Sequence, residues 1–304
     1  MKYRAFSAIA ASAALVVALT GCGEAGSAGT DPDASPTAEG TGDGPYNLEL
    51  AEDPTFDEGT TMAALAEAGS IRIGTKFDQP LFGLLGSGDD PEGFDVAIGA
   101  LVAAKLGIPF ENIDFSETVS ANREPFIQND QVDIVVATYT INDKRKEVIS
   151  FAGPYFEAGQ SIMVLESDEN ISGPEDLEGE PVCSVEGSTP AANIVAEYGA
   201  ELVATDAYSN CLDPLRNGQV VAVTTDNVIL SGFVDQNEGE FKIVGDTFTE
   251  EPYGIGLAKD DTEFRSFIND VLEESYEDGT WARLFDETAG TVLETPEPPA
   301  VDRY

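Results

Sequence analysis

The sequence contains no histidine, only three cysteines and few basic residues. Without histidine, the Ser-His-Asp and Cys-His arrangements of nucleophilic catalysis are excluded, and a zinc site is disfavoured. Lys and Arg together number 15, against 57 Asp and Glu, which gives a formal net charge of −42. Because binding to polyphosphate requires clustered cations, nucleic acid is disfavoured as a partner. Acidity of this kind is typical of a well-solvated surface.

The first 21 residues have the pattern of an export signal. Lys2 and Arg4 are followed by an uncharged apolar run, residues 8–19, which is shorter than a typical membrane-spanning helix. The next residues, Leu19-Thr20-Gly21-Cys22, resemble the lipobox of bacterial lipoproteins. This resemblance implies a lipid on Cys22 that holds the exported protein at the outer face of the cell membrane. An ordinary signal peptide with a chance cysteine is the alternative. No later apolar stretch approaches 18 residues, so the remainder is expected to be soluble.

Lipidation of Cys22 would leave Cys183 and Cys211 as a pair in an oxidising compartment. A disulfide between them would close a loop of about 28 residues and stabilise the fold by roughly 3–4 kcal/mol. Two buried free thiols, which behave as small apolar side chains, are the alternative.

Two stretches have compositions that favour disorder. Residues 22–60 are rich in small, proline and acidic residues as far as about Pro54, which predicts a flexible tether behind the lipid. Residues 295–304, which contain three prolines, are expected to form a disordered tail. The roughly 235 residues between them suffice for one large domain or two small ones.

The central region alternates short β-branched runs with stretches of helical pattern. Continuous apolar strands separated by helices predict an α/β fold with parallel sheets covered on both faces. Residues 127–136 and 215–223 resemble each other, which favours two similar lobes, although any α/β protein can echo itself by chance. The expected strands are 70–74, 132–137, 161–166, 181–185, 220–224 and 254–259, and the expected helices are 61–68, 96–106, 190–198, 212–217 and 263–278.

Polar residues follow four of the expected strands, and in open α/β sheets ligands bind beyond the carboxyl ends of strands. An arginine fork and the helix start at Ser188–Thr189 suit an α-carboxylate, while a carboxylate and hydroxyls suit an α-ammonium. Phe77 could cover an aliphatic stem. Taken singly, such an arginine is commonly a surface charge, and a Gly-Ser-Thr turn is commonly a helix N-cap. The four polar segments are Thr75–Asp78, Thr138–Thr140 with Arg145, Glu186–Pro190, and Thr224–Asp226.

Two motifs resemble the family 3 extracellular solute-binding proteins, receptors that feed polar amino acids to ABC importers. Residues 93–98, Gly-Phe-Asp-Val-Ala-Ile, look like the family's signature stretch. Residues 135–145, Val-Val-Ala-Thr-Tyr-Thr-Ile-Asn-Asp-Lys-Arg, look like its carboxylate-binding segment. Residues 151–155, Phe-Ala-Gly-Pro-Tyr, stand where the family usually has Phe-Ser-x-Pro-Tyr.

The resemblance, which spans about residues 61–288, implies a type II periplasmic-binding-protein-like fold. Each of two lobes would hold a mostly parallel sheet flanked by helices, and a hinge of two segments would let them close over a ligand. The first lobe would comprise residues 61–157 and 253–294, and the second residues 158–252.

By position, the resemblance assigns Arg145, Thr140 and Thr189 to the α-carboxylate and Asp226 to the α-amine. The segment Ser120–Arg123 precedes Arg145 by the spacing seen in glutamate- and aspartate-type members, where that arginine meets the side-chain carboxylate. Lys76 stands where those members also place a cation, so glutamate is the favoured ligand.

Alternatives remain at the distal end of the ligand. Arg123 could pair with its neighbour Glu124, and Lys76 could be neutralised by Asp78. Tyr208 falls where some members use a histidine, which leaves glutamine or aspartate open.

The sequence thus predicts a monomeric lipoprotein that delivers an amino acid to an ABC permease, without a cofactor or a metal. A sensor for a signalling receptor would use the same binding chemistry, whereas an enzyme on this fold is disfavoured. Residues 88–93 are expected to form a hairpin turn rather than a calcium loop. Trp281 is expected in the core.

Overall fold

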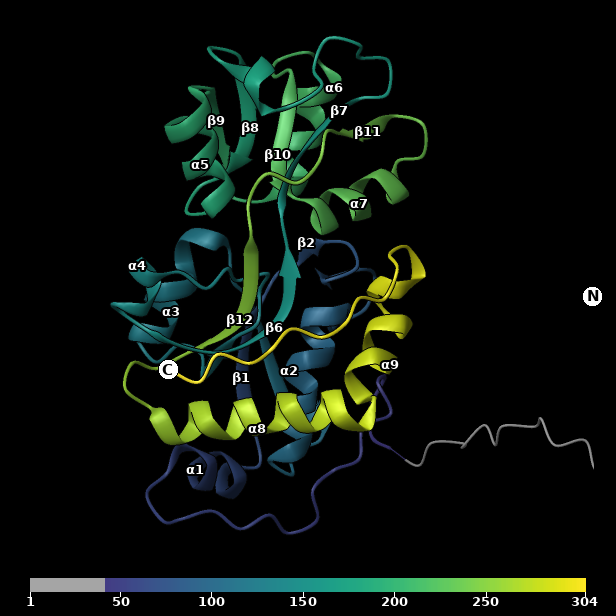
Figure 1. The fold of residues 1–304 in the computed structure, drawn as a ribbon. Helices are drawn as coiled ribbons and strands as arrows, with labels where there is room; N and C mark the ends of the chain where they lie inside the picture. Colours follow the sequence, from purple (N-terminus) through teal and green to yellow (C-terminus); the bar gives the residue numbers. More distant parts are fainter. Residues whose placement is uncertain (1–41) are drawn as a thin grey trace, which may run out of the picture. The chain divides into compact units, whose positions relative to one another are not determined.

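Short runs rich in β-branched residues form the strands of two five-stranded sheets, each flanked by helices (Figure 1). The structure is a computed structural model that describes residues 42–304. The expected export signal, Cys22 and the first part of the expected tether lie outside the described residues.

The first lobe is built on the sheet with strand order β4-β1-β5-β12-β6. Its strands are β1 (Ile71–Thr75), β4 (Ile113–Glu117), β5 (Ile134–Val135), β6 (Ser150–Ala158) and β12 (Glu251–Leu257), and a small hairpin joins β2 (Asp78–Gln79) to β3 (Gly83–Leu84). Its helices are α1 (Thr61–Ala68), α2 (Phe94–Lys105), α3 (Arg123–Gln128), α4 (Asp143–Lys146), α8 (Thr262–Asp278) and α9 (Thr280–Glu287), with 3₁₀ turns at Phe110–Asn112, Ser120–Asn122 and Ala289–Thr291.

The second lobe is built on the sheet with strand order β11-β7-β10-β8-β9. Its strands are β7 (Gln160–Leu165), β8 (Pro181–Val185), β9 (Glu201–Thr205), β10 (Ala222–Asp226) and β11 (Phe241–Val244). Its helices are α5 (Thr189–Tyr198), α6 (Leu212–Arg216) and α7 (Asn227–Gln236), with 3₁₀ turns at Pro174–Leu177 and Tyr208–Cys211.

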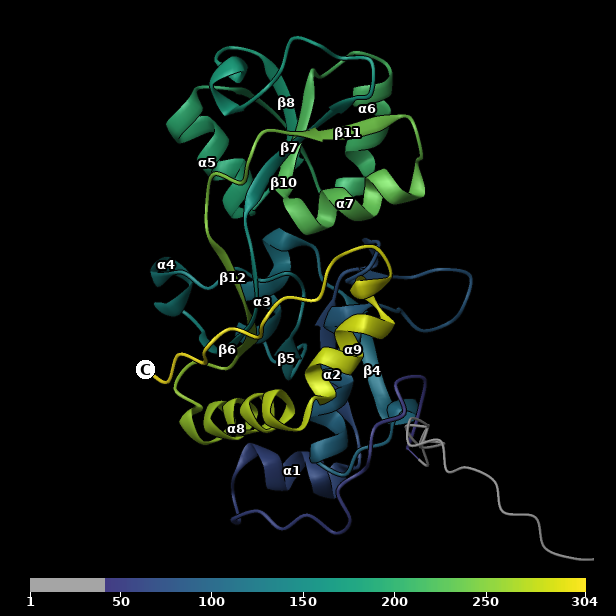
Figure 2. The same ribbon diagram turned by 45° about the vertical axis from the view of Figure 1, so that its right-hand side comes forward.

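Both sheets are mixed, rather than mostly parallel as the sequence predicts. The chain leaves the first sheet between β6 and β7 and returns between β11 and β12 (Figures 1 and 2). Every antiparallel pairing of the two sheets involves β7 or β12, the strands by which the chain enters each sheet from the other. The remaining pairs, β1 with β4 and β5 and β8 with β9 and β10, are parallel.

The two crossing segments lie against each other at Gly159, the single residue between β6 and β7. A Cβ atom there would lie 2.7 Å from the Cβ of Thr247, which belongs to the returning segment. Only glycine allows this close approach, so the hinge is a closely packed pair of segments rather than two independent linkers.

Parts of the two stretches expected to be disordered make specific contacts with the first lobe. Before α1, Tyr46 and Leu48 are buried, and the Tyr46 hydroxyl accepts a hydrogen bond from the amide of Gly93 at 3.2 Å. In the tail, the amide of Asp302 donates to the Gly153 carbonyl, and the Tyr304 hydroxyl accepts from the amide of Phe151 at 2.9 Å. The tail therefore covers the open edge of β6. The composition of these stretches does not predict such contacts, because only a few side chains within an otherwise polar segment make them.

The interior is organised by aromatic packing and one disulfide. Trp281 is fully buried, as expected, and stacks on Phe285 while its indole N–H donates to the Tyr155 carbonyl at 2.8 Å. The predicted disulfide joins Cys183 in β8 to Cys211, with 5.7 Å between their Cα atoms. It ties β8 to the turn that precedes α6.

Candidate ligand-binding site

A small cavity lies between the lobes, beyond the carboxyl ends of β5, β8 and β10, where open α/β sheets place their ligands. Its volume is only about 10 Å³, far below that of pockets for drug-sized ligands, so the side chains that line it are closely packed. The first lobe contributes Ser120, Arg123, Thr138 and Thr140, and the second contributes Ser188, Thr189, Pro190, Tyr208, Asp226 and Ile229. Eight of the eleven predicted ligand-binding residues are therefore brought together here, and Lys76, Phe77 and Arg145 are not in the lining.

Arg123 supplies the cavity with a positive charge and forms no ion pair with a carboxylate within residues 42–304. Its Nη1 donates to the carbonyls of Ala137 and Thr138 at 3.1 and 3.2 Å, and its Nε donates to the carbonyl of Ser120. The guanidinium lies 4.2 Å from the centroid of the Tyr139 ring, a cation–π contact. These contacts fix the orientation of the arginine and leave its charge available to an anionic ligand.

Glu124, the neighbour considered as a partner of Arg123, pairs with Arg145 instead. The Nε of Arg145 lies 3.2 Å from Glu124 Oε1, its Nη1 donates to the Thr140 carbonyl, and its Nη2 donates to the Gly187 carbonyl at 3.0 Å. Because Gly187 belongs to the second lobe, Arg145 bridges the two lobes. It lines a groove outside the cavity, and burial lowers its pKa to about 10.

Lys76 lies behind the cavity rather than in its wall. Its Nζ donates to the Ser120 hydroxyl at 2.9 Å, and the residue is only 3 % exposed. Burial, reinforced by the nearby charge of Arg123, lowers the pKa of Lys76 to about 7. No ion pair links it to Asp78 among the described residues. Ser120 therefore connects this cation to the cavity.

Thr138 follows the end of β5 by three residues and has a left-handed backbone conformation, with a φ of 44°. Its amide donates to Asp95 Oδ2 at 2.7 Å, and its hydroxyl donates to Gln79 at 3.0 Å. Asp95 also accepts from the Tyr155 hydroxyl at 2.5 Å, while burial raises its pKa to about 7. The signature motif containing Asp95 thus shapes the backbone beside the cavity.

Asp226 presents an unpartnered carboxylate oxygen on the second-lobe side. Its Oδ2 accepts from the Tyr253 hydroxyl at 2.5 Å, whereas Oδ1 is buried without a hydrogen-bond partner within residues 42–304. Burial, followed by the nearby charge of Glu251, raises the pKa of Asp226 to about 7. A buried acceptor of this kind suits a donor brought by a ligand.

Sequence reasoning missed Glu251, the first residue of β12. This buried carboxylate accepts at Oε2 from the hydroxyls of Thr140 and Thr189, at 2.6 and 2.7 Å, and at Oε1 from the Thr249 hydroxyl. The two threonine hydroxyls, one from each lobe, lie 3.1 Å apart. The only local signal was an acidic residue at the start of an otherwise apolar strand.

Comparison with known proteins identifies the family. Residues 71–291 match the bacterial extracellular solute-binding proteins, family 3. The chain belongs to this family. Within the described residues of this solute-binding protein, no helix is both long enough and apolar enough to cross a bilayer.

Two curated relatives illustrate the range of the family. The glutamate-binding protein GluB of Corynebacterium efficiens is 42 % identical over 243 residues, which cover 76 % of this chain and 83 % of that protein. The ABC transporter glutamine-binding protein GlnH of Bacillus subtilis is 36 % identical over 74 % of this chain and 83 % of its own length. Among solved structures, an ancestral arginine-binding protein bound to glutamine is 35 % identical, with a TM-score of 0.67 over 72 % of this chain and 97 % of its own.

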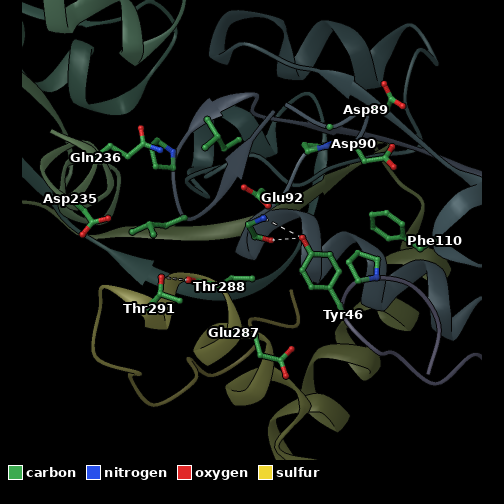
Figure 3. Close-up of a pocket in the computed structure, with 17 residues that line it drawn as sticks. Tyr46, Asp89, Asp90, Glu92, Phe110, Asp235, Gln236, Glu287, Thr288 and Thr291 are labelled. Atoms are coloured by element: carbon green, nitrogen blue, oxygen red, sulfur yellow. Dashed lines mark hydrogen bonds between the residues drawn. The ribbon is translucent and has the colours of Figure 1, made fainter. Parts of the chain in front are cut away.

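Figure 3 shows a second, wider groove of the solute-binding protein, with a volume of about 760 Å³. Five carboxylates and no basic residue line it: Asp89, Asp90, Glu92, Asp235 and Glu287. Tyr46 and Gly93 also line the groove, where the Tyr46 hydroxyl lies within hydrogen-bonding distance of the Gly93 carbonyl and amide. Without a cation, this groove is unsuited to a solute that carries a carboxylate. Within residues 42–304, no group of acidic, cysteine or histidine residues has the arrangement of a metal site.

Proposed function

We propose that this protein captures a free polar amino acid, with glutamate as the favoured ligand, and delivers it to an ABC import permease. The observation that carries the proposal is the polarity of the cavity. Arg123 offers an unneutralised guanidinium on one side, and Asp226 offers an unpartnered carboxylate oxygen on the other. A zwitterion satisfies both groups at once, and burial of unpaired charge is costly for any ligand that satisfies only one.

The choice of glutamate rests on the cations near the cavity and on the relatives. Glutamate carries two carboxylates and one ammonium, so its site needs at least two cationic centres. Arg123 lines the cavity, Lys76 reaches it through Ser120, and Arg145 lies at its rim with the Thr140 carbonyl between. The 42 % identity to a protein named as glutamate-binding supports the same choice. The proposed ligand-binding set therefore remains the one predicted from the sequence, with Phe77 as its least supported member.

Glutamine is the second candidate ligand, and the lowered pKa of Lys76 favours it. With a pKa of about 7, this lysine is uncharged in about half of the molecules at neutral pH. A neutral amine beside Ser120 can accept a hydrogen bond from the side-chain amide of glutamine. The 36 % identity to a glutamine-binding protein is consistent with this alternative.

We further propose that the protein is exported and is held at the cell surface by a lipid on Cys22. The match of Leu19–Cys22 to a lipobox supports a lipid anchor on Cys22, and membership in an extracellular family supports export. Because the matched relatives are solute-binding proteins, we propose that the ligand leaves the site chemically unchanged.

Isothermal titration of the purified protein with glutamate, glutamine, aspartate and a neutral amino acid tests the proposal. The expected result is saturable binding that is tightest for glutamate. Arg123→Ala should weaken glutamate more than glutamine, because only glutamate brings a second carboxylate. Tighter binding of glutamine would reverse the choice of ligand, and no binding of any amino acid would refute the function.

A further inference from the structure

We propose that Glu251 is a positioning residue that makes one side of the cavity specific for an ammonium group, by holding the hydroxyl protons of Thr140 and Thr189. This inference rests on the proposed function and concerns the same cavity. Glu251 itself does not line the cavity, but both threonines do.

A threonine hydroxyl has one proton to donate and lone pairs that accept. The hydroxyls of Thr140 and Thr189 lie 2.6 and 2.7 Å from Glu251 Oε2, which as a carboxylate oxygen only accepts. Each hydroxyl proton is therefore used within this cluster, on Glu251 or on the neighbouring threonine hydroxyl. Toward the cavity these hydroxyls can act only as acceptors, so they suit a donor. This differs from the assignment implied by the family resemblance, which placed both threonines at the α-carboxylate; only their backbone amides could serve that group.

Asp226 lines the same cavity as the two threonines. Its Oδ1 is buried without a partner in the described part of the chain, and its charge interacts with that of Glu251. Thr140, Thr189 and Asp226 thus supply three acceptors to the wall of the cavity. An α-ammonium has three N–H donors to match them. The ligand's carboxylates are then left for Arg123.

The Glu251 carboxylate is buried, with the residue 3 % exposed, and three hydroxyls but no cation contact it within residues 42–304. The charge of Arg145, which donates to the Thr140 carbonyl, acts on it from outside this contact shell. A buried anion without a contacting cation is stabilised by a positive charge placed nearby. A ligand ammonium on the threonines would supply that charge one hydrogen bond away.

The test compares L-glutamate with glutarate, which has the same two carboxylates but no ammonium, in Glu251→Gln and Glu251→Leu. Titration calorimetry should give a loss of at least tenfold in glutamate affinity for Glu251→Leu, a smaller loss for Glu251→Gln, and less than threefold change for glutarate. Thr249→Val is the matched control. It removes the hydroxyl on the other carboxylate oxygen, outside the cavity, and should leave the glutamate-to-glutarate ratio unchanged.

Equal losses for the two ligands would overturn the inference, because they would mean that Glu251 only holds the lobes together. Tighter glutamate binding in Glu251→Leu would also overturn it. If glutarate gives no measurable heat, the variant Thr189→Val provides the test instead. Its combination with Glu251→Leu should bind glutamate no more weakly than Glu251→Leu alone, and additive losses would contradict the inference.

Thermal unfolding of each variant separates a folding defect from a binding defect, and Glu251→Gln preserves the shape of the side chain if Glu251→Leu fails to fold. A wild-type protein that binds no amino acid would overturn the proposed function and this inference together. Normal wild-type binding with unaltered variants would overturn this inference alone.

Discussion

Lys76 should make the preference for glutamate over glutamine depend on pH. Its pKa of about 7 in the ligand-free protein is set by burial and by the charge of Arg123, with Asp78, Asp95 and Arg145 as the other charged groups that act on it. A glutamate side-chain carboxylate favours the charged lysine, so the complex binds more protons than the free protein above pH 7. Affinity for glutamate must therefore fall as the pH rises, whereas glutamine brings no such charge.

The size of the effect follows from the fraction of lysine that carries a proton. With a pKa of about 7, this fraction is about one half at pH 7 and about one hundredth at pH 9. If glutamate binds only the protonated form, its Kd relative to that of glutamine should rise about 50-fold over this interval. The ratio isolates Lys76, because the titration of Asp226, whose pKa is also about 7, affects both ammonium ligands alike.

Calorimetric titration with both ligands at pH 6, 7, 8 and 9 measures the ratio. In Lys76→Met it should be nearly constant and shifted toward glutamine. Ser120→Ala, which removes the hydroxyl between Lys76 and the cavity, should reduce the slope. A constant ratio in the wild type would refute the reasoning, because it would show that the ligand does not interact with the lysine charge.

Four further outcomes are expected. Replacing both Cys183 and Cys211 by alanine should lower the free energy of unfolding by about 3.5 kcal/mol in denaturant titrations, since the loop they close is opened; an unchanged midpoint would contradict this. Tyr304→Ala should cost about 1–2 kcal/mol, because Lys146 and Arg265 lie 4.0 and 4.2 Å from its ring centroid, and Tyr304→Phe should recover most of that loss. Arg145→Ala should weaken every amino acid at least tenfold in calorimetry, because the bridge to the second lobe is lost; a loss confined to glutamate would argue for a distal contact instead. Cys22→Ala should abolish the mass increment of a diacylglyceryl group on the amino-terminal peptide and release the protein into the medium, and an unmodified wild-type peptide would exclude the anchor.

Much of the fold could be predicted because local pattern and tertiary structure agree. Expected helix 61–68 coincides with α1, and expected strand 181–185 coincides with β8. Strand β9 was missed because its residues are exposed or half-buried and lack a continuous apolar run. Strand β6 was missed because Gly153 and Pro154 interrupt its pattern. The mixed sheets result from the two crossings of the chain between the lobes, and no local sequence pattern predicts these crossings.

Part of the candidate site could be predicted from the ends of the strands. Thr138 and Asp226 lie at the carboxyl ends of β5 and β10, so the topology brings them to one cavity, whereas Arg123 was predicted only from the family resemblance. The partner of Arg145 could not be foreseen, because Glu124 lies one residue from Arg123 in sequence but pairs with Arg145 in space. Glu251 was missed for a similar reason, since a single acidic residue has no pattern and its role depends on threonines from both lobes.

The disulfide has a consequence for where the site can operate. Cys183 lies in the strand that leads to Ser188, and Cys211 closes the turn that contains Tyr208, so the bond fastens two walls of the cavity to each other. Thiols stay reduced in the bacterial cytosol and oxidise after export. The fastening of these two walls therefore requires an oxidising compartment, and the reduced chain lacks it.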